Sequence, residues 1–330
     1  MNTPDPLTPK TIQEIATAFQ RSRALLTAFE LEIFTTLNDQ RLTAAEVAEG
    51  VAASPRYVDR LMTALVALGL LEKADGRFAN TPLTAAHLVK GRPGYMGGLG
   101  HTLHLWDTWS AMTEVVREGR PAHRAAINER GGDWLRPFIA AMHARARQTA
   151  PELVAALDLT GVSRVLDVGG GSGAYAMAFA RARAGITAVV FDLPNVVPLT
   201  QAYIREESLS AQVETAAGNY MTDSIGGGFD LALLSMVIHS HSPEENRALL
   251  AKVAAALAPG GQLVVQDFLM AEDREGPLQP ALFALNMLVG TEGGDTYTES
   301  EVRGWLREAG FTWVARKDTS FGSSLVIVRR

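Results

Sequence analysis

The chain has 330 residues, of which 47% are hydrophobic and 20% charged, and its formal net charge is −6. This balance fits a folded globular protein, excludes a largely disordered chain, and does not favour nonspecific binding to nucleic acid. Cysteine is absent, which excludes disulfides, thiolate metal ligands and cysteine nucleophiles. A chain longer than about 250–300 residues usually divides into domains, so we expect two. No leader pattern opens the chain and no apolar window reaches the roughly 20 residues of a membrane span, so we expect a cytoplasmic protein.

The first 80 residues carry the pattern of a winged helix. Apolar residues recur at helical spacing over residues 11–37, which predicts amphipathic helices with broad buried faces. Thr43 begins a capping box for a short helix, and a second helix is expected over residues 55–70. Asp75-Gly76 lies between two short extended segments and predicts a two-residue hairpin turn. A helix-turn-helix followed by a hairpin makes a winged helix.

The rest of the chain changes from helices to alternating strands and helices. Residues 91–150 are predicted to be helical, and from residue 162 onward the alternation predicts a parallel sheet with covering helices. The predicted strands are 164–168, 187–192, 212–216, 229–236, 262–268, 312–317 and 324–328. The expected fold class is therefore α/β, with a winged-helix domain over residues 1–110, a helical connector over 111–155 and a seven-stranded Rossmann-like domain over 156–330.

A glycine-rich loop follows the first strand of this pattern, in Val165-Leu166-Asp167-Val168-Gly169-Gly170-Gly171-Ser172-Gly173. Glycines there let the backbone approach a ligand closely. Asp167 places a carboxylate beside the loop, which suits an amino-acid ammonium group and would repel a pyrophosphate. Asp192 ends the second strand, where a carboxylate can accept both hydroxyls of a ribose. An ammonium group and a ribose occur together in S-adenosylmethionine, so Asp167 and Asp192 favour that cofactor. Because Gly169, Gly171 and Ala174 also satisfy the dinucleotide fingerprint, a nicotinamide cofactor remains an alternative.

Several further motifs follow in a characteristic order. They are Phe191-Asp192-Leu193-Pro194, Gly218-Asn219-Tyr220, His239, Ala258-Pro259-Gly260-Gly261, Gly293-Gly294 and Thr298-Glu299. Together with the winged helix and the glycine loop, the chain resembles the two-domain S-adenosylmethionine-dependent O-methyltransferases, which include plant caffeate and flavonoid enzymes and bacterial enzymes of secondary metabolism. The resemblance covers nearly the whole chain. It implies a homodimer formed through the N-terminal domain.

The resemblance also implies where the cofactor binds. The positions that match the family's cofactor contacts are Gly169, Gly171, Asp192, Leu193, Asn219, Tyr220, Ser235 and Met236, and Asp167 joins them on the charge argument above. Three positions depart from the family pattern. Asn219-Tyr220 replaces an acid followed by Met or Phe at the adenine, although these side chains can still hydrogen-bond and stack. Ser235 stands where plant members often carry a lysine.

Methyl transfer to a phenol needs a base for the hydroxyl proton and close alignment of the reacting atoms. His239 follows the fourth strand at the carboxyl edge of the sheet, where ligands of open α/β folds bind, and it matches the family's catalytic histidine. Asp267 matches one of the acids that orient this histidine. Thr296 occupies the position of the second acid, and Ser240 occupies the position of the aspartate that usually follows the histidine. These replacements leave open an acidic phenol or a carbon nucleophile as acceptor, or catalysis by alignment alone. The plain alternative is that His239 or His241 only caps the helix near residue 243.

The acceptor is expected among apolar and aromatic side chains. By resemblance, Phe283, Met287 and Leu288 line the acceptor site. We expect Trp134, Phe138 and Met142 to close it, although Met and aromatic residues at helical spacing are also typical of plain core. No metal site is expected, because no set of histidines and carboxylates shows ligand spacing.

Two rival functions are considered, one from another class of protein and one from within the family. A winged helix often reads DNA, but the would-be recognition helix carries only Arg56 and Arg60 among apolar residues and offers few groups to phosphates and bases. A family member diverged to C-methylation, hydroxylation or decarboxylation is the second rival, because a fold does not fix a function. We therefore expect S-adenosyl-L-methionine as cofactor, a small aromatic acceptor, and no nucleic-acid or membrane partner.

Overall fold

The computed structural model describes residues 8–122 and 131–330, so residues 1–7 and part of the predicted connector, 123–130, lie outside the described residues. The chain divides into two compact units, one up to Leu103 and one from His104 onward, and each is described by itself. No helix of the described ranges is both long enough and apolar enough to cross a membrane.

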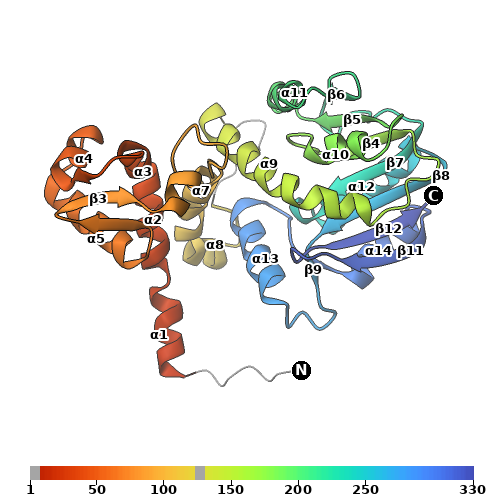
Figure 1. Cartoon of the computed structure of the whole chain (residues 1–330). Helices are drawn as coiled ribbons and strands as arrows, with labels where there is room; N and C mark the ends of the chain where they lie inside the picture. Colours follow the sequence, from red (N-terminus) through yellow and green to blue (C-terminus); the bar gives the residue numbers. More distant parts are fainter. Residues whose placement is uncertain (1–7, 123–130) are drawn as a thin grey trace. The chain divides into compact units, whose positions relative to one another are not determined.

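The N-terminal unit is a small helical domain with a three-stranded sheet (Figure 1). Its elements are α1 (Pro9–Thr17), α2 (Phe19–Glu30), α3 (Ile33–Leu37), β1 (Leu42–Thr43), α4 (Ala44–Gly50), α5 (Pro55–Ala67), β2 (Leu71–Ala74), β3 (Arg77–Asn80) and α6 (Pro82–His87). The sheet order is β1-β3-β2, and Asp75 and Gly76 both have positive φ in the turn between β2 and β3. The predicted helix-turn-helix and hairpin are confirmed, and so is the capping box of Thr43 with Glu46.

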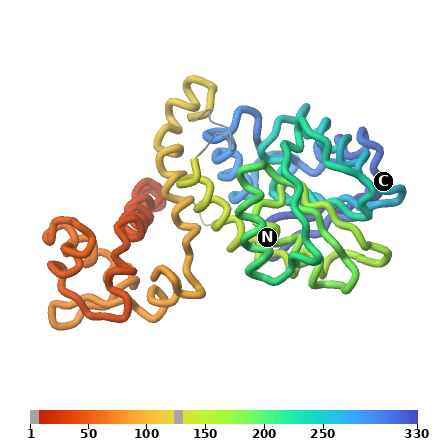
Figure 2. The backbone as a smooth tube through the Cα atoms, turned by 90° about the horizontal axis from the view of Figure 1, so that it is seen from above, coloured from red at the N-terminus to blue at the C-terminus, as the bar shows by residue number. Residues whose placement is uncertain are grey.

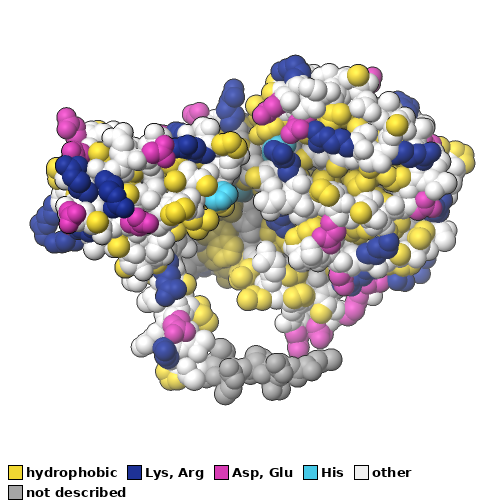
Figure 3. Space-filling view, in the orientation of Figure 1, with side chains coloured by type: hydrophobic (Ala, Val, Ile, Leu, Met, Phe, Trp, Pro, Cys, Tyr) yellow, Lys and Arg dark blue, Asp and Glu magenta, His cyan; other side chains and the backbone are white. Residues whose placement is uncertain are grey.

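Two details of this unit differ from the prediction. Helix α5 ends at Ala67, not at residue 70, because Gly69 at φ 74° lets the backbone turn into a Schellman motif, in which the Leu70 amide donates to the Leu65 carbonyl. The buried face predicted for residues 11–37 exists in α2 and α3 but not in α1, which buries none of its residues. Hydrophobic side chains lie on the surface of α1 (Figure 3).

The C-terminal unit is built around a seven-stranded sheet in the order β11-β12-β8-β7-β4-β5-β6, which confirms the predicted strands. The strands are β4 (Arg164–Val168), β5 (Thr187–Asp192), β6 (Val213–Ala217), β7 (Phe229–Ser235), β8 (Leu257–Asp267), β11 (Thr312–Asp318) and β12 (Ser324–Arg329). All neighbours are parallel except those of β12, which runs against both β8 and β11. The sheet is therefore mixed, not wholly parallel.

Helices cover both faces of the sheet. The described helices that follow the N-terminal domain are α7 (Leu99–Ser110), α8 (Met112–Glu118), α9 (Gly132–Ala155), α10 (Ala174–Ala182), α11 (Val197–Glu206), α12 (Pro243–Ala256), α13 (Leu278–Gly290) and α14 (Glu299–Glu308), and the boundary between the two units falls within α7. A 3-10 turn, η2 (Ile238–Ser240), follows β7, and β9 (Leu269–Met270) pairs with β10 (Tyr297–Thr298) in a separate two-stranded ladder. One hydrophobic cluster joins the sheet to α12 and α14, and a second joins it to α9, α10 and α11. Helices α8 and α13 are distant in the sequence and lie side by side (Figure 2).

The strand order reverses at β4. From β4 the chain proceeds through β5 and β6 in one direction, whereas β7 and β8 lie on the other side. The loops that leave β4 and β7 therefore diverge at the carboxyl edge of the sheet, and such a switch point is where open α/β sheets bind ligands.

Candidate functional site

The glycine loop leaves β4 and leads into α10. Gly169, Gly171 and Gly173 have φ values of 67°, 56° and 75°, a left-handed region that other residues rarely adopt. A side chain at Gly170 would place its Cβ 2.6 Å from the carboxyl carbon of Asp167. The loop therefore lies directly against Asp167, and glycine is required there for both conformation and space.

Asp167 is fully buried at the end of β4. Neither carboxylate oxygen has a hydrogen bond of ordinary geometry within the described residues. Burial raises the pKa of Asp167 to about 7, and the nearby amide of Ala176 only partly opposes this shift. A buried carboxylate without a partner is costly, and a bound ammonium group would supply the missing charge.

Asp192 ties the end of β5 to the glycine loop. Its two oxygens accept hydrogen bonds from the amides of Gly171 and Leu193, each at 2.7 Å. The Thr200 hydroxyl donates to the carbonyl of Gly171 from the next helix. Burial raises the pKa of Asp192, whereas the two amides favour its charged form. These bonds fix the carboxylate at the carboxyl edge of the sheet, where it can still accept ribose hydroxyls.

Tyr220 lies against the same loop. A Cβ added at Gly169 would be 3.3 Å from the Tyr220 ring and 3.2 Å from Val237. The Tyr220 hydroxyl and Nε2 of His241 are 2.8 Å apart, and burial raises the pKa of the tyrosine. The neighbouring Asn219 uses its side-chain oxygen to accept from the Met221 amide.

The end of β7 supplies the next two predicted positions. Ser235 donates to the side chain of Gln266 at 2.8 Å, and the Met236 amide donates to the Gln266 carbonyl at the same distance. Met236 has φ 56°, which is uncommon for a residue with a side chain and marks local backbone strain. This bend directs the chain from β7 into η2.

His239 and Asp267 form a buried pair. His239 lies in η2 and Asp267 ends β8, and Nδ1 of the imidazole is 2.9 Å and 3.0 Å from the two carboxylate oxygens. The carboxylate also accepts from the backbone amides of His239 and Phe268. With Nδ1 donating its proton to Asp267, the lone pair of His239 lies on Nε2, which can then accept a proton.

Neither histidine caps the following helix. Ser242 is the N-cap of α12 and forms a capping box with Glu245. His241 instead contacts Tyr220. The capping alternative for His239 and His241 is therefore wrong.

Thr296 occupies the position of the family's second acid, and its hydroxyl already forms a hydrogen bond. Thr296 is buried and donates to the Pro280 carbonyl at 3.2 Å, so its side chain does not reach His239 through a hydrogen bond. The backbone holds the histidine instead, because the Asp295 amide donates to the His239 carbonyl at 3.0 Å. A Cβ at Gly294 would collide with that carbonyl, and a Cβ at Gly293 would lie 2.9 Å from the Cβ of Ser242, which explains the glycine pair. Ser240 is half-buried at the end of η2.

Aromatic residues surround the His239 ring. Phe283 meets the imidazole edge-on at 4.8 Å between ring centres, and Phe268 packs on Phe283 at the same distance. We call His239, Phe268 and Phe283 the ring cluster. Met287 is buried one turn further along α13, whereas Leu288 lies on the surface of this unit.

The other predicted acceptor residues lie on α9. Trp134 and Phe138 stack at 4.8 Å and pack against the buried cluster of Leu135, Ile139 and Val196, against which Leu193, the residue after Asp192, also packs. Met142 is half-buried one turn further along. The predicted positions thus form two neighbourhoods, one around the glycine loop and Asp192 and one around His239.

His143 was missed by the sequence analysis. Its Nδ1 lies 2.9 Å from the Ser172 hydroxyl in the glycine loop, and its ring stacks on Tyr203 at 3.9 Å. Burial, aided by the charge of Arg147, lowers the pKa of His143 to about 4, so the side chain is neutral. No local motif marks this contact, because the two residues lie 29 positions apart.

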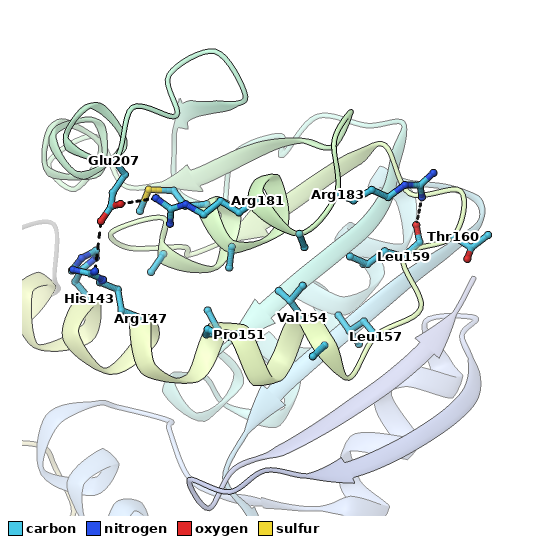
Figure 4. A pocket seen from close by; sticks show the side chains of 16 residues that line it. His143, Arg147, Pro151, Val154, Leu157, Leu159, Thr160, Arg181, Arg183 and Glu207 are labelled. Carbon is cyan, nitrogen blue, oxygen red and sulfur yellow. Dashed lines mark hydrogen bonds and ion pairs between the residues drawn. The ribbon is translucent and has the colours of Figure 1, made fainter.

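A groove of about 830 Å³ lies between α9 and α10 (Figure 4). His143 and Arg147 from α9 and Arg181 from α10 line it, and Glu207 pairs with both arginines. Neither His239 nor Asp192 is among its lining residues. Over residues 8–122 and 131–330, no group of three or more metal-ligating side chains occurs.

Comparisons with known proteins identify the family. Residues 109–312 match the O-methyltransferase domain family and residues 13–90 match the O-methyltransferase dimerisation domain. A 3-hydroxy-5-methyl-1-naphthoate 3-O-methyltransferase of Streptomyces sahachiroi is 35% identical over 92% of this chain and 89% of its own length. A tetracenomycin polyketide synthesis 8-O-methyl transferase of Streptomyces glaucescens is 33% identical over 98% and 97%.

Solved structures agree as well. PigF with S-adenosylhomocysteine has a TM-score of 0.90 and 25% identity, covering 98% of this chain and 100% of its own. Human N-acetylserotonin methyltransferase in complex with S-adenosylmethionine has a TM-score of 0.86 and 28% identity, covering 100% and 99%. The fold and site thus define an S-adenosylmethionine-dependent methyltransferase with an N-terminal dimerisation domain, which supports a homodimer. The chain belongs to the O-methyltransferase family.

The described residues fit this cofactor. The unpartnered carboxylate of Asp167 and the close backbone of the glycine loop are the features that an amino-acid ammonium group and a nucleoside require. The nicotinamide and DNA-binding alternatives are not favoured by the family matches, which cover both units.

Proposed function

We propose that this enzyme methylates the hydroxyl of a small phenolic acceptor and that His239 removes the proton. The observation that carries the proposal is the pair of 2.9 Å and 3.0 Å contacts between Nδ1 of His239 and the Asp267 carboxylate, beside the Phe283 ring. These contacts support a proton on Nδ1 that is donated to Asp267, and with that tautomer Nε2 is the basic atom.

The His239 imidazole takes the phenolic proton on Nε2 as the oxygen attacks. Asp267 then faces an imidazolium, and its negative charge stabilises that cation as in other base and carboxylate pairs. Bound S-adenosylmethionine supplies the methyl group on a positively charged sulfur. Because Asp267 is held by two backbone amides and Thr296 carries no charge, a single carboxylate orients the base here.

The cofactor assignments are part of the same proposal. Asp167 would face the ammonium group, Asp192 the ribose hydroxyls, and Tyr220 and Asn219 the adenine, with Gly169, Gly171, Leu193, Ser235 and Met236 forming the walls. Asp192 supports this most directly, because it is fixed by two amides at the end of β5. The aromatic acceptor is supported by the ring cluster and by relatives named for a naphthoate and a polyketide.

An acceptor screen tests the proposal. Purified enzyme is incubated with S-adenosylmethionine carrying a trideuterated methyl group and a panel of naphthols, hydroxynaphthoates and catechols, and products are read by mass spectrometry. A gain of a deuterated methyl on oxygen is expected for at least one phenol and not for the matched methyl ether. Transfer to carbon, or to amines only, would overturn the phenolic assignment.

A further inference from the structure

Arg145 lies on the same face of α9 as three residues that are predicted from the sequence to close the acceptor site. Trp134, Phe138, Met142 and Arg145 follow one another at spacings of four, four and three residues, which places them along one side of a helix. The first three are apolar, so a cation at the end of this row is unexpected for a plain packing face.

The guanidinium of Arg145 lies against the ring cluster. Its central carbon is 5.1 Å from the centre of the Phe268 ring, and Phe268 is almost fully buried. Phe268 directly follows Asp267 and packs on Phe283, which in turn meets His239. The cation therefore sits two aromatic rings from the base, on the side of the cluster formed by α9.

Arg145 is also distinguished by its burial. It is half-buried, whereas the other described arginines of the C-terminal unit are exposed, whether they pair with a carboxylate, as Arg181 and Arg247 do, or form no ion pair with a described residue, as is the case for Arg136 and Arg205. No described carboxylate lies within 4.0 Å of Arg145, which is only half-exposed and whose guanidinium contact is the Phe268 ring. A half-buried cation without a counter-ion is unfavourable, and a planar guanidinium matches a carboxylate in two parallel hydrogen bonds.

We propose that Arg145 binds a carboxylate on the aromatic acceptor, so that the enzyme selects hydroxylated aromatic carboxylates over neutral phenols. The inference rests on the proposed function for the location of the acceptor. The aromatic body of the acceptor packs against the ring cluster, its carboxylate meets Arg145, and its hydroxyl meets His239. Arg145 is a specificity residue in this account and takes no part in proton transfer.

A binding measurement tests this without relying on catalysis. 1-Naphthoate lacks a hydroxyl and cannot be methylated on a phenolic oxygen, and methyl 1-naphthoate is its neutral counterpart. Both are titrated calorimetrically into enzyme saturated with S-adenosylhomocysteine. We expect the wild type to bind the acid more tightly than the ester, and Arg145→Leu to weaken the acid by about 10- to 100-fold while leaving the ester unchanged.

Controls separate recognition from structure. Arg147→Gln removes the same charge from the same helix, beside the groove that α9 forms with α10, and should leave the affinity for the acid unchanged. Arg145→Lys keeps the charge and should retain part of the preference, while a Tm equal to that of the wild type shows that each variant is folded. Failure of the wild type to prefer the acid, or an equal loss for acid and ester in Arg145→Leu, would overturn the inference.

Kinetics distinguish this inference from the proposed function. With hydroxynaphthoic acids as acceptors, Arg145→Leu should raise KM and leave kcat nearly unchanged, because the lost contact is a binding contact. If the wild type methylates neutral naphthols as efficiently as the acids, the role of Arg145 is refuted and the phenolic function stands. If the acid binds through Arg145 but no phenol is methylated, the proposed function fails and the anion site stands.

Discussion

Asp167 is a buried carboxylate whose charge state is coupled to ligand binding. Its pKa is raised from the usual 3.8 to about 7 by burial, so the folded, ligand-free protein retains a proton that the unfolded chain has already released. The stabilisation from this group is complete below about pH 4 and is lost as the pH rises through 7. A ligand with an ammonium group reverses the preference, because it favours the ionised carboxylate.

The Asp167→Asn variant tests this coupling. In the wild type without added ligand, ionisation of Asp167 should lower the Tm as the pH is raised from 5 to 8, by roughly 2–4 °C for each kcal/mol of unfolding free energy that is lost. The Asn variant should lack this pH-dependent decrease in Tm. S-Adenosylhomocysteine should raise the Tm of the wild type more at pH 8 than at pH 5. Thermal denaturation of both proteins across this range is the measurement, and an identical pH dependence in the two would contradict the assignment.

Residues of the site were predictable from the sequence where they lie in local motifs. Asp192 and His239 each end or follow a predicted strand, so their position at the carboxyl edge follows from topology alone. The contacts between Tyr220 and His241 and between His143 and Ser172 were not predictable, because they join elements whose relative rotation is set by packing. Arg145 carries no sequence signal apart from its place in a helical row.

At the scale of elements, α9 links the glycine loop to the rest of the C-terminal unit. His143 holds Ser172 and stacks on Tyr203 of α11, so one side chain connects three elements. Because the pKa of His143 falls to about 4, the unfolded chain binds a proton there between about pH 6.5 and 4 that the folded chain does not. The folded state is therefore progressively destabilised by this group as the pH falls through that window.

Replacing His143 with Phe tests the role of this link. The ring stacking is kept and the hydrogen bond to Ser172 is lost, so the Kd for S-adenosylhomocysteine should rise by about 3- to 10-fold. The variant should also lose the part of the acid sensitivity that arises between pH 6.5 and 4. Calorimetric titration and denaturation at both pH values measure the two effects, and unchanged cofactor affinity would show that α9 does not support the loop.

The strands were predictable because their signal is local. The predicted strands 164–168 and 187–192 coincide with β4 and β5, and the others differ at their ends. The antiparallel position of β12 between β8 and β11 was not predicted. The alternation of strands and helices indicates parallel pairing, and this alternation stops at the last two strands, which have no helix between them.

At the scale of the whole molecule, α1 carries apolar side chains that no other part of the described chain buries. Ile12 and Ile15 of α1 and Phe19 at the start of α2 are 63%, 69% and 54% exposed, although their spacing is that of a buried helical face. Sequence periodicity cannot tell whether such a face is covered by its own chain or by another. The dimerisation-domain match over residues 13–90 includes two of these residues and supports burial of this face between two copies.

Placing charges on α1 tests its role in assembly. Ile12→Asp with Ile15→Asp should shift the protein from dimer to monomer, because each buried isoleucine contributes about 1.5–3 kcal/mol. The fold of each copy should persist, since α1 buries none of its own residues. Light scattering coupled to size exclusion measures the mass, with Gln13→Asp as the matched control on the same helix. A dimer that survives the double substitution would place the interface elsewhere.

The central claim is that His239, held by Asp267, removes the proton from the acceptor hydroxyl. Its most direct test is single-turnover methyl transfer by His239→Asn and Asp267→Asn, with Asp230→Asn at the opposite edge of the sheet as control and the Kd for S-adenosylhomocysteine measured in parallel. We predict that His239→Asn lowers the rate by about 10²- to 10⁴-fold and that Asp267→Asn lowers it by a smaller factor, with cofactor affinity retained in both. A His239→Asn enzyme that transfers methyl groups at the wild-type rate would contradict the account.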